Sequence, residues 1–145
     1  MPPTAPKPRP AEVRVNKKIK VYLDKQIVEA YADDKLIYSF DCCSGDRDHP
    51  TPTGRFLVKR KCKEHVSDIY NVPMDYAIFF TIHVAIHQYH GPWPVSWLRN
   101  QRLGGDDWIG SHGCVRLDES DARSLFEWTP LSTPIEVIKL TPKSK

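Results

Sequence analysis

Short extended runs separated by turn residues are the feature that most constrains how this chain folds. Apolar and polar residues alternate along 18–23 and 26–31, and the intervening Asp24-Lys25 pair predicts a two-residue hairpin turn. Further runs rich in β-branched and aromatic residues follow at 35–45, 55–61, 76–81, 84–87 and 134–140. Because Gly, Asp and Pro separate several of these runs and no internal repeat is present, the pattern predicts a mainly-β sheet or barrel.

A single segment, ESDARSLFEW at 119–128, has a helical pattern. It places Ala122, Leu125 and Phe126 on one face, and Asp118 stands where a helix N-cap is expected. The sequence therefore predicts one short helix packed on the sheet.

Length and charge limit the class of protein. A chain of 145 residues suits one domain, and its 21 basic and 18 acidic residues are interleaved to a net charge of +3. No long basic run is present, so nucleic acid is not expected as a partner. No apolar run approaches the ~18 residues that a membrane span requires, and no signal peptide is present.

Residues 1–14 differ from the rest of the chain, with five prolines among the first ten residues. This composition predicts a semi-rigid linker or a tail, and the folded domain is expected over 15–142. The chain is either cytosolic or a mature or truncated piece of an exported protein, and the proline-rich segment favours the second.

The segment between His87 and Ser111 carries three of the four tryptophans, Trp93, Trp97 and Trp108. A connection of this length is typically functional or disordered, and aromatic residues argue against disorder. We expect it to be a lid loop, with at least one tryptophan lining a cleft. The alternative is that the tryptophans only bury a local cluster.

The four cysteines lack the paired spacing of a zinc site. A hairpin around residues 45–54 would place Cys62 opposite a residue near 37, too far from Cys42 or Cys43 for a disulfide, so we interpret Cys42, Cys43 and Cys62 as free, packed thiols. No metal or cofactor is expected, although a site built from His and Cys side chains stays conceivable. Its members would be His87, His90, His112 and Cys114.

Cys114 lies in IGSHGCVRL, residues 109–117, between His112 and Arg116. A catalytic cysteine needs its thiolate, which a nearby cation or backbone N–H groups stabilise. The amides of Gly113 and Cys114 could also form an oxyanion hole. The residues alone leave two readings open: a nucleophile, or a buried thiol beside a hydrogen-bonded histidine.

The motif SHGCVRL, residues 111–117, with AIH at 85–87, resembles the active-site signature of the L,D-transpeptidases, bacterial cell-wall enzymes with a catalytic cysteine. Residues 44–58, 74–81 and 119–138 are also similar to that family, so the resemblance covers about 15–140. It implies an L,D-transpeptidase-like β-sandwich or barrel with one short helix and a lid loop.

The resemblance also implies roles for individual residues. Cys114 is the implied nucleophile and an upstream histidine the general base, while Arg116 holds an anionic group of the substrate. Ser111, His112 and Gly113 shape the turn around the nucleophile, and we expect Trp93 and Trp108 of the lid to contact substrate.

The base has two candidates, because the chain departs from the family pattern of histidine followed by glycine. His87 is followed by Gln88, whereas His90 precedes Gly91. We favour His87, because it continues a predicted strand and a base needs rigid support, and we assign His90 to substrate binding in the lid.

The implied reaction is a crosslink between diamino acids of peptidoglycan stem peptides, formed through a cysteine thioester. Its implied setting is extracytoplasmic, in the periplasm or cell wall, with the export signal or anchor absent from this chain. A monomer is expected, with carbapenem-type β-lactams as inhibitors. The alternatives are an L,D-carboxypeptidase, an amidase, an enzyme attaching proteins to the wall, an unrelated cell-wall cysteine peptidase and a non-catalytic wall-binding module.

Overall fold

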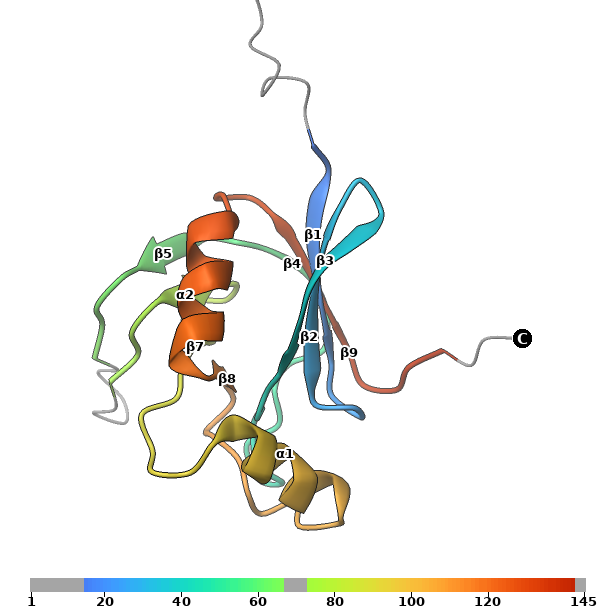
Figure 1. Ribbon diagram of the computed structural model, residues 1–145, viewed down its shortest axis with the longest axis vertical. Coiled ribbons are helices and arrows are strands. Elements are labelled where there is room, and N and C mark those ends of the chain that lie inside the picture. The colour runs from blue at the N-terminus through green and yellow to red at the C-terminus, as the bar shows by residue number, and fades with distance from the viewer. Residues whose placement is uncertain (1–14, 67–72, 143–145) are drawn as a thin grey trace, which may run out of the picture.

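The computed structural model describes residues 15–66 and 73–142 and folds them into two β-sheets and two helices (Figure 1). The first sheet, in spatial order, contains β3 (Lys35–Asp41), β2 (Ile27–Ala32), β1 (Lys17–Tyr22), β9 (Pro134–Ile138) and β4 (Gly54–Leu57). The second contains β5 (Arg60–Cys62), β6 (Ala77–Phe79), β7 (Ala85–Gln88) and β8 (Val115–Leu117). The mainly-β prediction is confirmed.

The first hairpin forms as predicted, but its turn is longer. β1 ends at Tyr22 and β2 begins at Ile27, so residues 23–26 form the connection rather than the Asp24-Lys25 pair alone. Gln26 leaves the predicted strand because it adopts a left-handed backbone (φ 54°) and its buried amide side chain bonds Leu23 O and Ser44. Tertiary hydrogen bonding therefore overrides the alternating pattern at this position.

The predicted strand 55–61 is divided between the two sheets. β4 pairs with β9, whereas β5 pairs with β6. Between them, the Val58 N–H donates to Thr133 O at 3.0 Å and the Lys59 N–H donates to Phe79 O at 2.8 Å. The chain thus changes sheets at these two residues, which a continuous alternation could not reveal.

The main core fills the space between the two sheets and the helix α2 (Glu119–Trp128). Its buried members include Val21 of β1, Ile135 of β9, Ile86 of β7 and Leu125 of α2. The bounds of α2 match the predicted helix, and Phe126 and Trp128 pack at the edge of this core. Among the helices described, none has the length and apolar character needed to cross a membrane.

A second helix, α1 (Val95–Leu103), lies inside the segment that we expected to be a lid loop, so the prediction of one helix is wrong. Val95 and Leu98 of α1 are buried, and Asp118 bonds the first residue of the helix. Asp118 stands at the N-cap position of α2, but its carboxylate accepts a hydrogen bond from the Val95 N–H at 3.1 Å. The predicted linker or tail at 1–14 lies outside the described residues.

Candidate active site

The parallel pairing of β7 with β8 brings the histidine strand beside the cysteine strand. Ile86 pairs with Val115, and both face the main core, while His87 pairs with Arg116 on the opposite face. Cys114 immediately precedes β8, two residues before Arg116. Neighbouring strands lie about 4.8 Å apart, and two residues along a strand span about 6.6 Å. The Cα atoms of His87 and Cys114 therefore occupy diagonal positions about 8 Å apart through space. Their side chains share one face of the sheet.

The Cys114 side chain is half-buried beside a small apolar cluster that includes Phe79 and Ala85. Its thiol contacts the carbonyl oxygen of His83 at 3.8 Å. Burial raises the pKa of Cys114, while the backbone N–H of Ala85 and the positive charge of Arg116 act in the opposite direction. The resting residue is therefore a thiol that requires a base for activation.

His87 is buried, with 4% of its surface exposed, and has the properties of such a base. Its Nδ1 lies 2.7 Å from Gln88 O, and because a carbonyl only accepts, Nδ1 carries the proton and Nε2 the lone pair. Burial lowers the pKa of His87 to about 4, with Arg116 contributing in the same direction. The imidazole of His87 and the thiol of Cys114 are therefore both neutral at pH 7 in the resting state.

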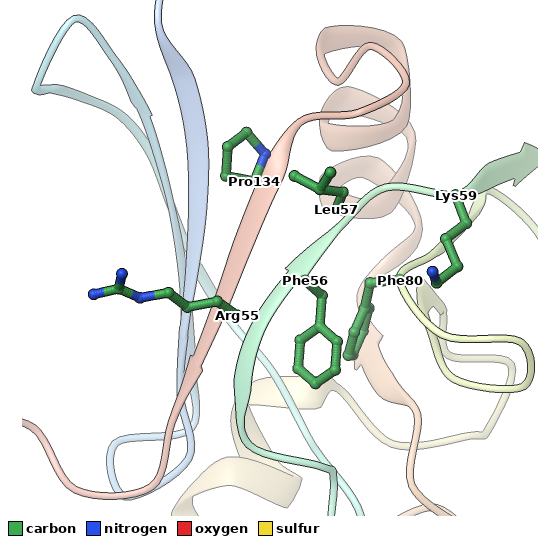
Figure 2. A pocket seen from close by; sticks show the side chains of 6 residues that line it. All are labelled: Arg55, Phe56, Leu57, Lys59, Phe80 and Pro134. Carbon is green, nitrogen blue, oxygen red and sulfur yellow. The ribbon is translucent and has the colours of Figure 1, made fainter.

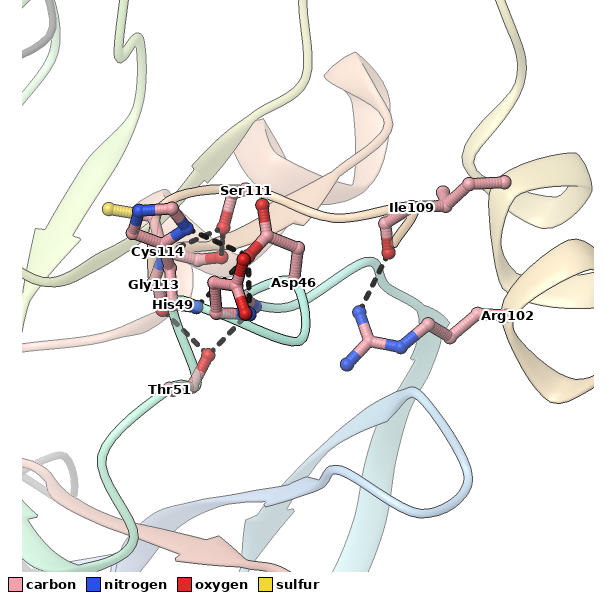
Figure 3. Close-up of polar contacts among 10 residues, drawn as sticks. Asp46, His49, Thr51, Arg102, Ile109, Ser111, Gly113 and Cys114 are labelled. Atoms are coloured by element: carbon pink, nitrogen blue, oxygen red, sulfur yellow. Dashed lines mark hydrogen bonds and ion pairs between the residues drawn. The ribbon is translucent and has the colours of Figure 1, made fainter. Parts of the chain in front are cut away.

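The turn before Cys114 is held by hydroxyl groups (Figure 3). Ser111 Oγ donates to Cys114 O and accepts from the Gly113 N–H at 3.2 Å, and Thr51 Oγ1 donates to Gly113 O at 2.6 Å. Gly113 has φ +127°, a backbone conformation that strongly favours glycine. The Gly113 amide is thus engaged inside the turn, whereas the Cys114 N–H has no acceptor within residues 15–66 and 73–142. The sequence predicts that both amides face an oxyanion, whereas the Gly113 N–H bonds Ser111 Oγ instead.

The loop after β3 supports this turn from the other side. A Cβ on Gly45 would lie 1.8 Å from His49 O, so only glycine fits there. The His112 ring packs edge-on against His49 at 4.6 Å, and His49 Nδ1 bonds Asp46 Oδ1 at 2.8 Å. The structure therefore places His112 against this loop.

Arg116 lies between two side chains that sequence analysis did not assign to the site. Its Nη2 donates to Cys43 Sγ at 3.4 Å, and its guanidinium stacks over the Tyr89 ring at 4.9 Å. A charge in this position acts on both His87 and Cys114, because Arg116 pairs with His87 across the strands and lies two residues after Cys114 in the sequence.

The remaining candidates are His90 and the tryptophans, and the charges of His90 and Asp75 both act on the pKa of His87. His90 Nε2 pairs with Asp75 Oδ2 at 2.9 Å. Trp93 and Trp97 stack on each other at 4.9 Å, and Trp108 lies under the Arg47 guanidinium at 5.1 Å. All three tryptophans are exposed, and their lining of the approach to Cys114 stays a prediction.

A cavity of about 430 Å³ lies elsewhere, where β4 meets the residues after β6 (Figure 2). Figure 2 shows the tilted rings of Phe56 and Phe80 side by side at its wall, and none of the predicted site residues lines it. Within the part of the chain that the structure describes, no group of three or more His, Cys, Asp or Glu residues is arranged to hold a metal ion. All four cysteines are free.

Sequence analysis missed Cys43, Tyr89, Thr51 and the Ala85 N–H. Thr51 lies within residues 44–58, which resemble the family, but no local signal distinguishes Cys43 from Cys42. Cys43 reaches Arg116 through an antiparallel bridge between residues 73 positions apart, which no sequence spacing reveals.

Comparison with solved structures shows the same fold in L,D-transpeptidases. An L,D-transpeptidase from Stackebrandtia nassauensis has 25% identity and a TM-score of 0.73, covering 89% of this chain and 58% of its own. An L,D-transpeptidase–avibactam carbamoyl enzyme has 29% identity and a TM-score of 0.69, covering 87% and 50%. One solved in complex with imipenem has 20% identity and a TM-score of 0.70, covering 86% and 59%.

This chain thus spans between half and three fifths of the length of each of these three proteins. Among curated proteins, none matches the chain. The family comparison covers most of the chain: residues 16–137 match the L,D-transpeptidase catalytic domain family known as YkuD. The chain therefore belongs to the YkuD family of L,D-transpeptidase catalytic domains.

Proposed function

We propose that this domain crosslinks peptidoglycan stem peptides through a thioester on Cys114, with His87 as the general base. The observation that carries the proposal is the β7–β8 register, which puts a neutral imidazole and a half-buried thiol on one face of the sheet. Membership of the L,D-transpeptidase family supports the reaction class.

The first half-reaction cleaves the donor, a tetrapeptide stem, between its diamino acid and the terminal D-alanine. The Cys114 thiol gives its proton to His87 Nε2 as the sulfur bonds the carbonyl carbon. The amide C–N bond then breaks, the imidazolium returns the proton to the leaving D-alanine amine, and a thioester remains. The Cys114 N–H is the donor available to stabilise the oxyanion.

The second half-reaction joins the two stems. The side-chain amine of a second diamino acid attacks the thioester carbonyl and loses a proton to His87, which then returns a proton to the departing Cys114 sulfur. Arg116 provides a planar cation for a substrate carboxylate next to this centre. His90, Trp93 and Trp108 are candidate contacts for the rest of the stem.

The reaction belongs outside the cytoplasm, in the periplasm or cell wall, where peptidoglycan is crosslinked. Carbapenem-type β-lactams are expected to acylate Cys114, because related enzymes were solved with imipenem and as an avibactam carbamoyl enzyme. We assign the domain no cofactor, and we expect it to act as a monomer.

Intact-mass analysis with a tetrapeptide donor, with and without an acceptor stem, tests the proposal. We expect an acyl adduct with loss of D-alanine, and a crosslinked dimer when the acceptor is added. Cys114→Ala should show neither, whereas Cys62→Ala, which removes the other half-buried thiol, should show both. A hydrolysed tripeptide as the sole product would make the domain an L,D-carboxypeptidase, and absence of any adduct would reject acyl transfer.

A further inference from the structure

Cys43 is a fully buried thiol to which the mechanism above gives no role. It forms an antiparallel bridge with Arg116, in which the Cys43 N–H donates to Arg116 O at 3.0 Å and the Arg116 N–H donates to Cys43 O at 2.9 Å. Because paired residues on neighbouring strands point to the same face, Cys43, Arg116 and His87 form one row across the sheet. The adjacent Cys42 faces the main core instead.

The Arg116 guanidinium has few partners in this row. Nη2 donates to Cys43 Sγ at 3.4 Å, the Tyr89 ring lies 4.9 Å away, and the buried Nε has no partner within the described residues. A buried N–H without an acceptor is costly, and loss of the sulfur would also remove the side-chain acceptor of Nη2. The sulfur is therefore the hydrogen-bond acceptor that keeps this cation in place.

Helix α1 in turn fixes the position of the sulfur. Val95 and Leu98 form a buried cluster with Cys43, and Tyr89 and Ile109 pack at its edge. The helix is tied down at its first residue by Asp118. A segment that the sequence presents as a loop thus packs against Cys43, whose sulfur accepts a hydrogen bond from Arg116.

We propose that Cys43 is a positioning residue for Arg116: its sulfur, seated by α1, fixes the guanidinium on the face of the sheet that presents His87 and Cys114. The positioning itself follows from the contacts above. Its consequence for turnover rests on the proposed function, in which Arg116 binds a substrate carboxylate. The two parts are therefore tested separately.

Nitrogen-15 NMR of the arginine Nε–H groups tests the positioning without any substrate. The Arg116 signal is identified by its loss in Arg116→Lys, and we expect it to exchange slowly with water. Cys43→Val fills the apolar site without offering an acceptor and should speed this exchange at least 10-fold. Cys43→Ser restores an acceptor and should stay within about threefold of the wild type.

Two further variants protect this test against a folding defect. Cys42→Ala removes a buried thiol on the other face and should leave the Arg116 signal unchanged. Should Cys43→Val fail to fold by circular dichroism, Cys43→Ala takes its place. Slow exchange retained in the folded Val or Ala variant would overturn the proposal.

Steady-state kinetics with the tetrapeptide donor then test the consequence. We expect Cys43→Val to raise KM about 10-fold with kcat within threefold, Cys43→Ser to recover most of that KM, and the Val substitution to add nothing in an Arg116→Lys background. An unchanged KM, or an equal loss in the Arg116→Lys background, would show that the position of Arg116 does not matter for substrate. A wild-type protein inactive on the donor would reject the proposed function and leave the NMR result standing.

Discussion

The two faces of the sheet formed by β5, β6, β7 and β8 differ in chemistry although the same strands build both. On the inner face, Ile86 and Val115 are buried in the main core between the sheets. On the outer face, one residue further along each strand, His87 and Arg116 form a polar pair. Successive side chains on a strand point to opposite faces, so each inner residue fixes the position of its outer neighbour.

The division between the faces keeps the buried His87 and the half-buried Cys114 in fixed relative positions. The inner residues secure the strands through apolar burial, and the outer residues need only short-range contacts such as His87 Nδ1 to Gln88 O. Stability and reactivity are thus assigned to opposite faces, and substitutions on each face should affect different measurements.

The largest expected effect is on the outer face, at the nucleophile. Cys114→Ala should abolish covalent acylation by imipenem while leaving the unfolding temperature within a few degrees, because the side chain is only half-buried. Cys42→Ala, on the inner side, should lower the unfolding temperature and leave acylation intact. Intact-mass analysis measures acylation and calorimetry measures the unfolding temperature of both variants. An imipenem adduct on Cys114→Ala would show that Cys114 is not the nucleophile.

His87 should come next. His87→Ala should slow acylation about 10²-fold or more, because the proposed base accepts the thiol proton as the sulfur attacks. His90→Ala, which breaks the pair with Asp75, should change donor KM more than acylation. Stopped-flow acylation measures both variants, and the reverse order would give the role of base to His90.

A matched change on the inner face should affect stability instead. Ile86→Ala should reduce the free energy of unfolding by about 2–5 kcal/mol, because it leaves a cavity in the main core. The variant should acylate at near the wild-type rate at temperatures where it stays folded. Denaturant titration measures the loss, and a stability loss below 1 kcal/mol would contradict the division between the faces.

Protonation of the buried His87 should make the stability of the protein depend on pH. Its pKa is about 4 in the folded protein against an ordinary value near 6.5, so the unfolded chain binds more protons between these values. Stability is therefore complete above about pH 6.5 and falls as the pH drops toward 4, by about 2–3 kcal/mol from this group. Denaturant titrations at pH 4.5 and 7 should show a smaller loss of unfolding free energy in His87→Gln than in the wild type. Equal losses in the two proteins would show that the pKa of His87 is not lowered by burial.

The smallest effect concerns the exposed tryptophans. If Trp108 or Trp93 borders the approach to Cys114, its replacement by alanine should weaken use of a stem peptide by about threefold to tenfold and acylation by imipenem less. Paired kinetics with the two reagents measure the difference. Equal effects on both would mean that the rings only pack on each other and on Arg47.

The sequence by itself determined the strand content, the helix at 119–128 and the family motif around Cys114. These features depend on neighbours a few residues apart: alternation predicts strands, 3.6-residue spacing predicts α2, and SHGCVRL is contiguous. The preference for His87 as the base also came from its strand context.

Tertiary structure alone decided where β4 gives way to β5, why α1 exists and which cysteine meets Arg116. Helix α1 has Pro94 before it and only two buried residues, Val95 and Leu98, so its local signal is weak and packing on Cys43 supports it. The Cys43–Arg116 contact joins segments distant in sequence, and its chemistry depends on which face each residue takes. Such cross-strand register is set by the packed core as a whole, because shifting a strand by one residue would turn every side chain to the other face.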